Sequence, residues 1–208
     1  MPDTYNIATR QYITSSGARS RREVRELLEK LLDHTKGSAR TLATQYDDGE
    51  ISITEFEAGM RSLLKSSHLV SASIGRGGRS RMTAKDWGRV GNKIRWQNGY
   101  LKRFARRLAN GMSKSMSESR AASYSAAIYT SYADSVAETR SEWKDAGYGK
   151  DGEELVRLVT DSAESCAECA ADEAEGWVPE SELSPLFSRI CGDWCRCEIL
   201  WKSDEGSI

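Results

Sequence analysis

Hydrophobic residues recur at spacings of three and four through the first two thirds of the chain, which is the pattern of amphipathic helices. In residues 20–37 a capping pair, Ser20 and Glu23, precedes this pattern and Gly37 follows it, so a helix is expected between them. A second helix is expected from about Thr54, with Glu57 as its capping partner. The residues expected on the two buried faces are Val24, Leu27, Leu28, Leu31, Leu32, Phe56, Met60, Leu63 and Leu64.

The longest periodic stretch begins at Thr83 and ends at Asn110, with one polar residue, Gln97, among its apolar positions. After Gly111, a capping pair and a row of large residues at every fourth position predict a helix over residues 115–147. Because the link between these helices is short, we expect an antiparallel hairpin. The apolar positions are Trp87, Val90, Ile94, Leu101, Phe104 and Leu108 in the first helix and Tyr124, Ile128, Tyr132 and Val136 in the second.

The hydrophobic pattern changes beyond residue 150. The segments 154–160 (ELVRLVT) and 198–201 (EILW) are rich in residues that favour strands, and all five cysteines lie between them. We therefore expect a mainly α protein in two parts. The first is a helical hairpin or bundle over residues 1–150, and the second is a small, cysteine-rich, metal-binding β unit over residues 151–208.

The cysteines form two clusters with the spacing C-x2-C-x21-C-x3-C-x-C, made of Cys166, Cys169, Cys191, Cys195 and Cys197. Four such thiolates typically hold one zinc ion that closes a small domain. One cysteine is surplus, and which of the last three is left out stays open. Because both histidines, His34 and His68, lie far from the clusters, we expect a structural zinc site and not a catalytic one. A zinc hydrolase and a group of reduced, metal-free thiols are the alternatives.

The composition is that of a soluble protein, with 29% charged residues and a mean hydropathy of −0.60. The N-terminal residues lack the apolar core of a signal peptide, and no apolar run approaches the roughly 18 residues that cross a membrane. We therefore expect no membrane contact and a cytosol-like compartment. Thiols stay reduced there, which favours metal binding over disulfides.

The net charge of −1 hides a strong asymmetry along the chain. Residues 76–114 carry 12 basic side chains and one acidic one, whereas residues 115–208 carry 8 basic and 20 acidic ones. The two blocks can neutralise one another within the fold or between copies, or the basic block can bind nucleic acid. For this alternative the residues that would contact phosphates are Arg76, Arg79, Arg81, Lys102, Arg103, Arg106 and Arg107.

Two groups of motifs resemble one known family, the phage head-morphogenesis or minor head proteins of the Mu F-like type. The resemblance covers roughly residues 56–201, and its most specific part is the C-terminal unit. The helical motifs are Gln97, Tyr100, Leu101 and Phe104, then Gly111 and Ser113, then Arg120, Ala121 and Tyr124; the C-terminal unit is Asp161, Cys166, Cys169, Gly176, Cys195, Arg196 and Cys197.

This resemblance implies a minor structural or assembly protein near the portal vertex of a tailed-phage head, without enzyme activity. The chain would then occur in the virion and, during assembly, in the host cytoplasm. Its partners would be portal or capsid proteins, while association with further copies or with DNA stays open. The family usually has a His-Pro pair before its CRC segment, and here Cys191 stands near that place and can substitute for the histidine as a zinc ligand.

Overall fold

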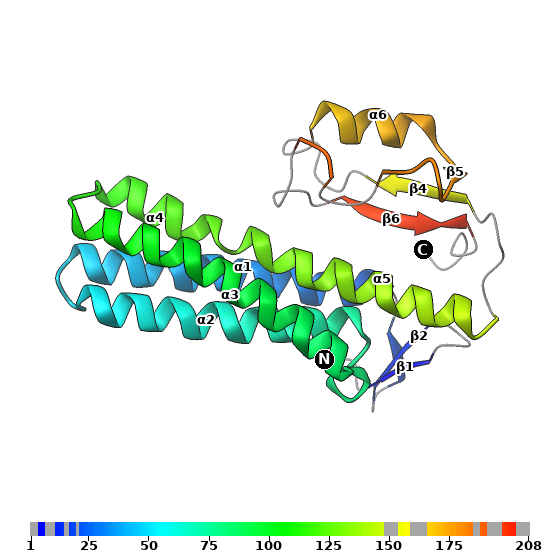
Figure 1. Cartoon of the computed structure of the whole chain (residues 1–208), viewed down its shortest axis with the longest axis horizontal. Helices are drawn as coiled ribbons and strands as arrows, with labels where there is room; N and C mark the ends of the chain where they lie inside the picture. Colours follow the sequence, from blue (N-terminus) through cyan, green and yellow to red (C-terminus); the bar gives the residue numbers. More distant parts are fainter. Residues whose placement is uncertain are drawn as a thin grey trace.

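The computed structural model describes residues 4–6, 11–14, 17–19, 21–147, 154–158, 166–184, 188–190 and 197–202. Ser20, Asp161, Cys191, Cys195 and Arg196, which carry several of the expectations above, lie outside them. As expected, the protein is mainly helical (Figure 1). The helices are α1 (Arg21–Asp47), α2 (Ile53–Gly75), α3 (Ala84–Ala109), α4 (Lys114–Ser123), α5 (Tyr129–Asp145) and α6 (Ala167–Glu175), with short 3-10 turns η1 (Arg79–Arg81) and η2 (Ala126–Ile128).

The long helices lie side by side along the long axis of the molecule (Figure 1). Helices α1 and α2 pack as a hairpin, α3 packs on α2, α4 packs on α1, and α5 packs on α2. Their apolar faces meet in one core that includes Leu28, Phe56, Leu64, Leu101 and Ile128, each at most 1% exposed. No described helix is both long enough and apolar enough to pass through a membrane.

Two expected helix ends are wrong. Helix α1 does not stop at Gly37 but continues to Asp47, because Ala39 and Ala43 carry its buried face onward into the core. A glycine inside a helix costs about 1 kcal/mol relative to alanine, which this packing offsets. Helix α2 begins at Ile53, and Ser52 forms its capping box with Glu55 rather than Thr54 with Glu57.

Helix α3 has the expected limits. Thr83 is its N-cap, and its side chain and backbone form a capping box with Asp86. Asn110 is the C-cap. The apolar seam is buried at Val90, Leu101, Phe104 and Leu108, and Gln97 is buried among them.

The helix expected over residues 115–147 is broken into α4, η2 and α5. The break changes what each part contacts, since α4 packs on α1 whereas α5 packs on α2. The α3 helix packs mainly on α2, so α3 and α4 do not form the closely packed hairpin that the short link indicated. A hollow between the C-terminal half of α3 and α4 is the result.

The C-terminal unit contains a small antiparallel sheet in the order β5-β4-β6, made of β5 (Val178–Pro179), β4 (Glu154–Leu158) and β6 (Glu198–Trp201). The two strand segments expected from the sequence are therefore confirmed, and they pair with each other. Helix α6, which the sequence did not indicate, packs on β4. On the bundle side, the Tyr129 hydroxyl of α5 donates to the backbone carbonyl of Cys197 at 3.2 Å.

A second antiparallel sheet lies at the N-terminus, in the order β1-β2-β3, with β1 (Thr4–Asn6), β2 (Gln11–Thr14) and β3 (Gly17–Arg19). The hydrophobic pattern did not predict it. These strands are only three or four residues long, which is too short for alternation to stand out.

Candidate functional site

Three of the five cysteines lie in the described part of the C-terminal unit. Cys166 is the N-cap of α6, and its sulfur accepts a hydrogen bond from the backbone N–H of Cys169 at 3.4 Å. The C-x2-C spacing therefore places both thiols on the first turn of one helix. Cys169 and Cys197 are buried, and Cys166 is half-buried.

The Cys169 sulfur lies beside a buried guanidinium. Arg157 of β4 is fully buried, and its Nη1 is 3.9 Å from Cys169 Sγ. Its Nε is 2.8 Å from Asp172 Oδ2 in an ion pair, and its Nη2 donates to the Ser184 carbonyl at 2.6 Å. The Cys169 sulfur is thus held beside a guanidinium that is itself paired with Asp172.

Cys197 directly precedes β6, the strand that pairs with β4. Arg157 lies opposite Ile199, and its side chain contacts α6 through Cys169 and Asp172. Directly opposed residues of antiparallel strands share a face, and so do residues two apart. Ile199 therefore lies on the α6 face with Arg157, whereas Cys197 precedes the paired residues. Among the described residues there is no group of three or more potential metal ligands, and Cys191 and Cys195 are not among them.

The seven basic residues expected at a nucleic-acid interface separate into two groups. In the first, Arg76 is 1% exposed, its Nε lies 3.1 Å from Asp86 Oδ2, and it also pairs with Glu142. The Arg76–Asp86 contact is an ion pair without hydrogen-bond alignment. Arg81 binds the other Glu142 oxygen at 2.8 Å, and Arg79 lies over the Trp87 ring. Arg76 is thus unable to reach a phosphate.

Asp86, the buried carboxylate that pairs with Arg76, is held in its charged form. Burial would raise the pKa of Asp86, but hydrogen bonds from Thr83 and Arg89 and the charge of Arg76 hold this pKa below its usual value.

Further along α3, the acidic residues of α5 neutralise the cations. Lys85 and Arg89 each bind Glu138 at 2.9 Å, and Lys93 binds Asp134 at 2.9 Å.

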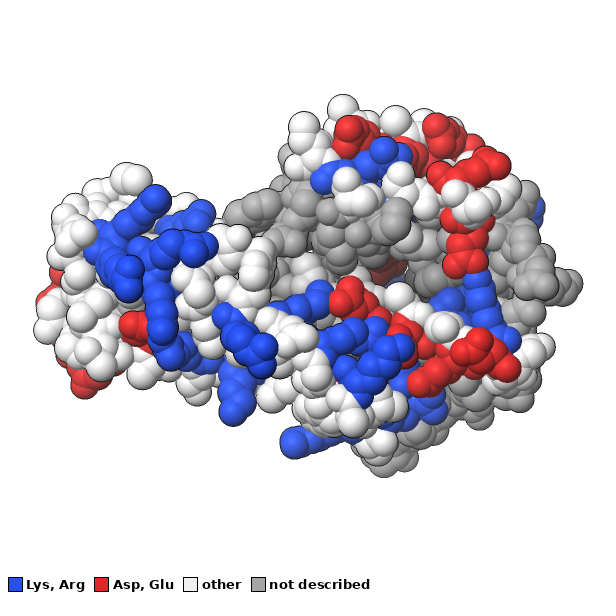
Figure 2. All heavy atoms as spheres, in the orientation of Figure 1, with Lys and Arg blue, Asp and Glu red and all other residues white. Residues whose placement is uncertain are grey.

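The second group, Lys102, Arg103, Arg106 and Arg107, is exposed at the other end of α3. Within the described ranges none of these four side chains has a carboxylate partner. Figure 2 shows the same division, with Lys and Arg gathered over the end of the bundle where α4 begins and interleaved with Asp and Glu toward the other end. Along α3, Lys85, Arg89 and Lys93 are therefore paired with acids, whereas these four side chains are not.

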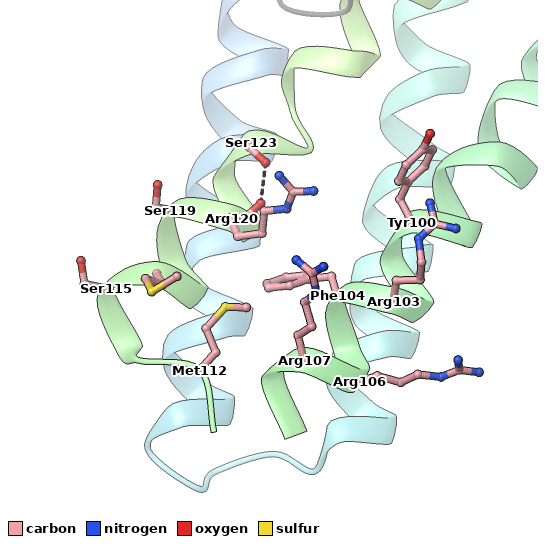
Figure 3. Close-up of a pocket in the computed structure, with 11 residues that line it drawn as sticks. Tyr100, Arg103, Phe104, Arg106, Arg107, Met112, Ser115, Ser119, Arg120 and Ser123 are labelled. Carbon is pink, nitrogen blue, oxygen red and sulfur yellow. Dashed lines mark hydrogen bonds between the residues drawn. The ribbon is translucent and has the colours of Figure 1, made fainter. Parts of the chain in front are cut away.

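The unneutralised arginines border a groove of about 980 Å³ between α3 and α4. Its lining residues include Arg103, Arg106 and Arg107 from α3 and Arg120 from α4, and no carboxylate. Figure 3 shows Arg107 and Arg120 extending into the space between the helices, above the Phe104 ring, while Arg106 points away from it. Sequence reasoning missed Arg120 as a site residue because it lies in the acidic block.

Exposed aromatic side chains continue this groove. Trp96 and Tyr100 are 55% and 37% exposed, their ring centroids are 4.5 Å apart, and the Arg103 guanidinium lies 4.3 Å from the Tyr100 ring. A second hollow of about 260 Å³ adjoins the groove and shares Tyr100, Arg120 and Ser123 with it. Positions 96, 100, 103 and 107 repeat at helical spacing and form an exposed stripe on α3. A search for buried apolar positions does not detect it, because these residues lie on the exposed side of the helix.

A buried polar network explains Gln97. Its amide nitrogen donates to the Tyr124 carbonyl at 2.9 Å, which leaves its oxygen to accept from His68 Nε2 at 2.6 Å. The other ring nitrogen, His68 Nδ1, lies 2.7 Å from the Ser131 hydroxyl. Burial lowers the pKa of His68 to about 4, so the ring is neutral at pH 7.

Comparisons with protein-family models, with curated proteins and with solved structures find no match to this chain. Its function is therefore inferred from its own residues.

Proposed function

We propose that the chain is a minor structural or head-morphogenesis protein of a tailed-phage particle, and that its C-terminal unit is closed by a structural zinc ion. The family resemblance described above is the basis of this role. It extends to portal or capsid proteins as partners and to a place in the virion after assembly in the host cytoplasm.

The observation that carries the proposal is that the helical motifs of the resemblance contact one another. Gln97 donates to the Tyr124 carbonyl, and the Phe104 and Tyr124 rings stack with centroids 5.8 Å apart. Leu101 and Ala121 are both fully buried. These motif residues pack the helices together, which suits a structural role, whereas Tyr100 and Arg120 of the same motifs line the groove.

The zinc proposal rests on the chemistry of the donors. Cys166 and Cys169 share a helical turn, Arg157 lies beside the Cys169 sulfur, and Cys197 directly precedes β6, which pairs with β4. In the proposal, Cys166 and Cys169 supply two ligands, and two of Cys191, Cys195 and Cys197 supply the others. Zinc would then hold α6 to the start of β6.

The structural role is tested in particles. If the phage that encodes this chain is grown and purified, mass spectrometry should detect the chain in virions. It should also be found in proheads if it acts during assembly. A chain that is absent from both particles would contradict the proposal.

The zinc site is tested on the purified protein. Metal analysis after reducing, chelator-free purification should give one zinc per chain. Cys169→Ser should lose it and unfold the C-terminal unit, since a structural zinc ion contributes roughly 10 kcal/mol or more to folding. Ala170→Ser, at an exposed position next to it, is the control that should keep the metal. Zinc-free wild-type protein would contradict this part of the proposal.

A further inference from the structure

We infer that the groove between α3 and α4 binds a single strand of nucleic acid, with backbone phosphates on its arginines and a base on the exposed Trp96. This inference does not depend on the proposed role in a phage particle, because it rests on the charge and shape of the groove alone.

The charge of the groove is available to a ligand. Four arginines line it, none of its lining residues is acidic, and these arginines have no carboxylate partner in the described part of the chain. Two acids on the neighbouring segments are engaged elsewhere: Asp48 binds Lys114 at 2.6 Å, and Glu118 accepts from Thr44 at 2.9 Å. Arginines are well suited to phosphates, because the guanidinium offers several donors in a planar fork.

The arginines lie on both sides of one continuous path. Arg103 and Arg107 are four residues apart on α3 and so occupy one face, and Arg120 faces them from α4 (Figure 3). The path continues along Arg120 and Tyr100 into the smaller hollow, which Trp96 also lines. A strand following this path would place successive phosphates near different arginines.

One observation at the far end of the path favours nucleic acid over an acidic peptide. The Trp96 ring is more than half exposed beside Tyr100, and a flat exposed ring can stack on a base. A base supplies such a stacking face, whereas a run of carboxylates does not.

A single strand fits these features better than a duplex. Stacking on Trp96 requires an unpaired base, because the faces of paired bases are covered by their neighbours. A groove enclosed by two helices also admits one backbone more readily than the width of a double helix.

The test measures binding of fluorescent oligonucleotides by anisotropy across a salt series. Three phosphate contacts, at Arg103, Arg107 and Arg120, predict that affinity for a single strand falls about twentyfold between 50 and 200 mM salt, with a slope of log affinity against log salt near −2.1. Arg107→Gln/Arg120→Gln should reduce this fall to about threefold. The matched control is Lys85→Gln/Lys93→Gln, which removes two α3 charges that are already paired with acids and should leave the slope unchanged.

Trp96→Ala tests the stacking contact separately. It should weaken single-strand binding by about tenfold or more and leave the salt slope unchanged, because it removes no charge. Three results would overturn the inference: binding of neither single strand nor duplex at low salt, equal effects of the groove variant and its control, or tighter binding of polyglutamate than of the oligonucleotide. Duplex binding that equals single-strand binding and ignores Trp96→Ala would overturn the single-strand assignment.

Discussion

Buried His68 should make the stability of the protein depend on pH in a defined window. Its ring lies among Ser131, Gln97 and the bundle core, and it is 1% exposed. Burial is the main cause that lowers its pKa to about 4, and the charge of Lys93 acts in the same direction. In the unfolded chain the pKa of a histidine is about 6.5.

The direction of this pH dependence follows from the number of protons that the folded and unfolded states bind. Between pH 6.5 and 4 the unfolded chain holds a proton on His68 that the folded protein does not, so the free energy of unfolding falls as the pH falls. The fall begins near pH 6.5 and levels off below about pH 4. A difference of about 2.5 pKa units corresponds to about 3 kcal/mol in total, of which about 2 kcal/mol is lost by pH 5.

Other groups also titrate in this range, so the assay compares variants. Urea unfolding of wild type and His68→Gln, followed by circular dichroism between pH 7 and pH 4, gives the free energy of unfolding of each. Glutamine can still hydrogen-bond Ser131 and Gln97, but it does not titrate. The wild type should therefore lose about 3 kcal/mol relative to the variant as the pH falls from 7 to 4.

His34→Gln controls for the removal of an imidazole at an exposed position. If the difference between wild type and His68→Gln stays constant across the whole pH range, then His68 is not held neutral by burial, and the argument from the His68 network fails.

Two further predictions concern helix contacts and the buried ion pairs. Gly75→Ala should destabilise the protein by about 1–3 kcal/mol, because its Cβ would lie 2.4 Å from the Tyr132 carbonyl oxygen, whereas Gly37→Ala, with open space around it, should stabilise by up to about 1 kcal/mol. Thermal denaturation of the two alanine variants checks this, and equal melting temperatures would contradict the close α2–α5 contact. Arg76→Met should cost about 3 kcal/mol, because buried Asp86 would lose one of its two guanidinium partners and keep only Arg89, whereas the exposed Arg79→Met should cost little. Urea titration separates these outcomes, and equal losses would contradict the buried ion pair.

The sequence predicted the helices well where two signals agreed. Helix α3 has a capping pair at Thr83, an apolar seam and a clear end at Asn110, and its limits are confirmed. At Gly37 the glycine is the only local signal for a helix end. The packing of Ala39 and Ala43 in the core outweighs it, and the helix continues. Local signals indicate where a helix can end, but tertiary contacts decide whether it does.

The site was less predictable, because the partners lie far apart in the sequence. Arg76 and Arg107 are the same residue type, and they differ because Asp86 and Glu142 lie beside Arg76. Glu142 is 66 residues away in the sequence. Periodicity also shows which face of a helix is buried but not which helix covers it, so the separation of α3 from α4 and the groove between them could not be inferred. Gln97 was visible as a polar interruption, but His68 could not be identified as its partner.

The uneven neutralisation of α3 gives the molecule one cationic end. A 26-residue helix is about 39 Å long, roughly four times the screening length at 0.1 M salt, so charges at its two ends act almost independently in solution. A polyanion approaching the protein would be attracted to the end that carries Arg103 and Arg107 and would meet little net field at the other. The attraction between the polyanion and this cationic end would thus orient the bundle before contact, with the C-terminal unit turned away. Added salt shortens the range of the field, so this orientation would be lost at high salt.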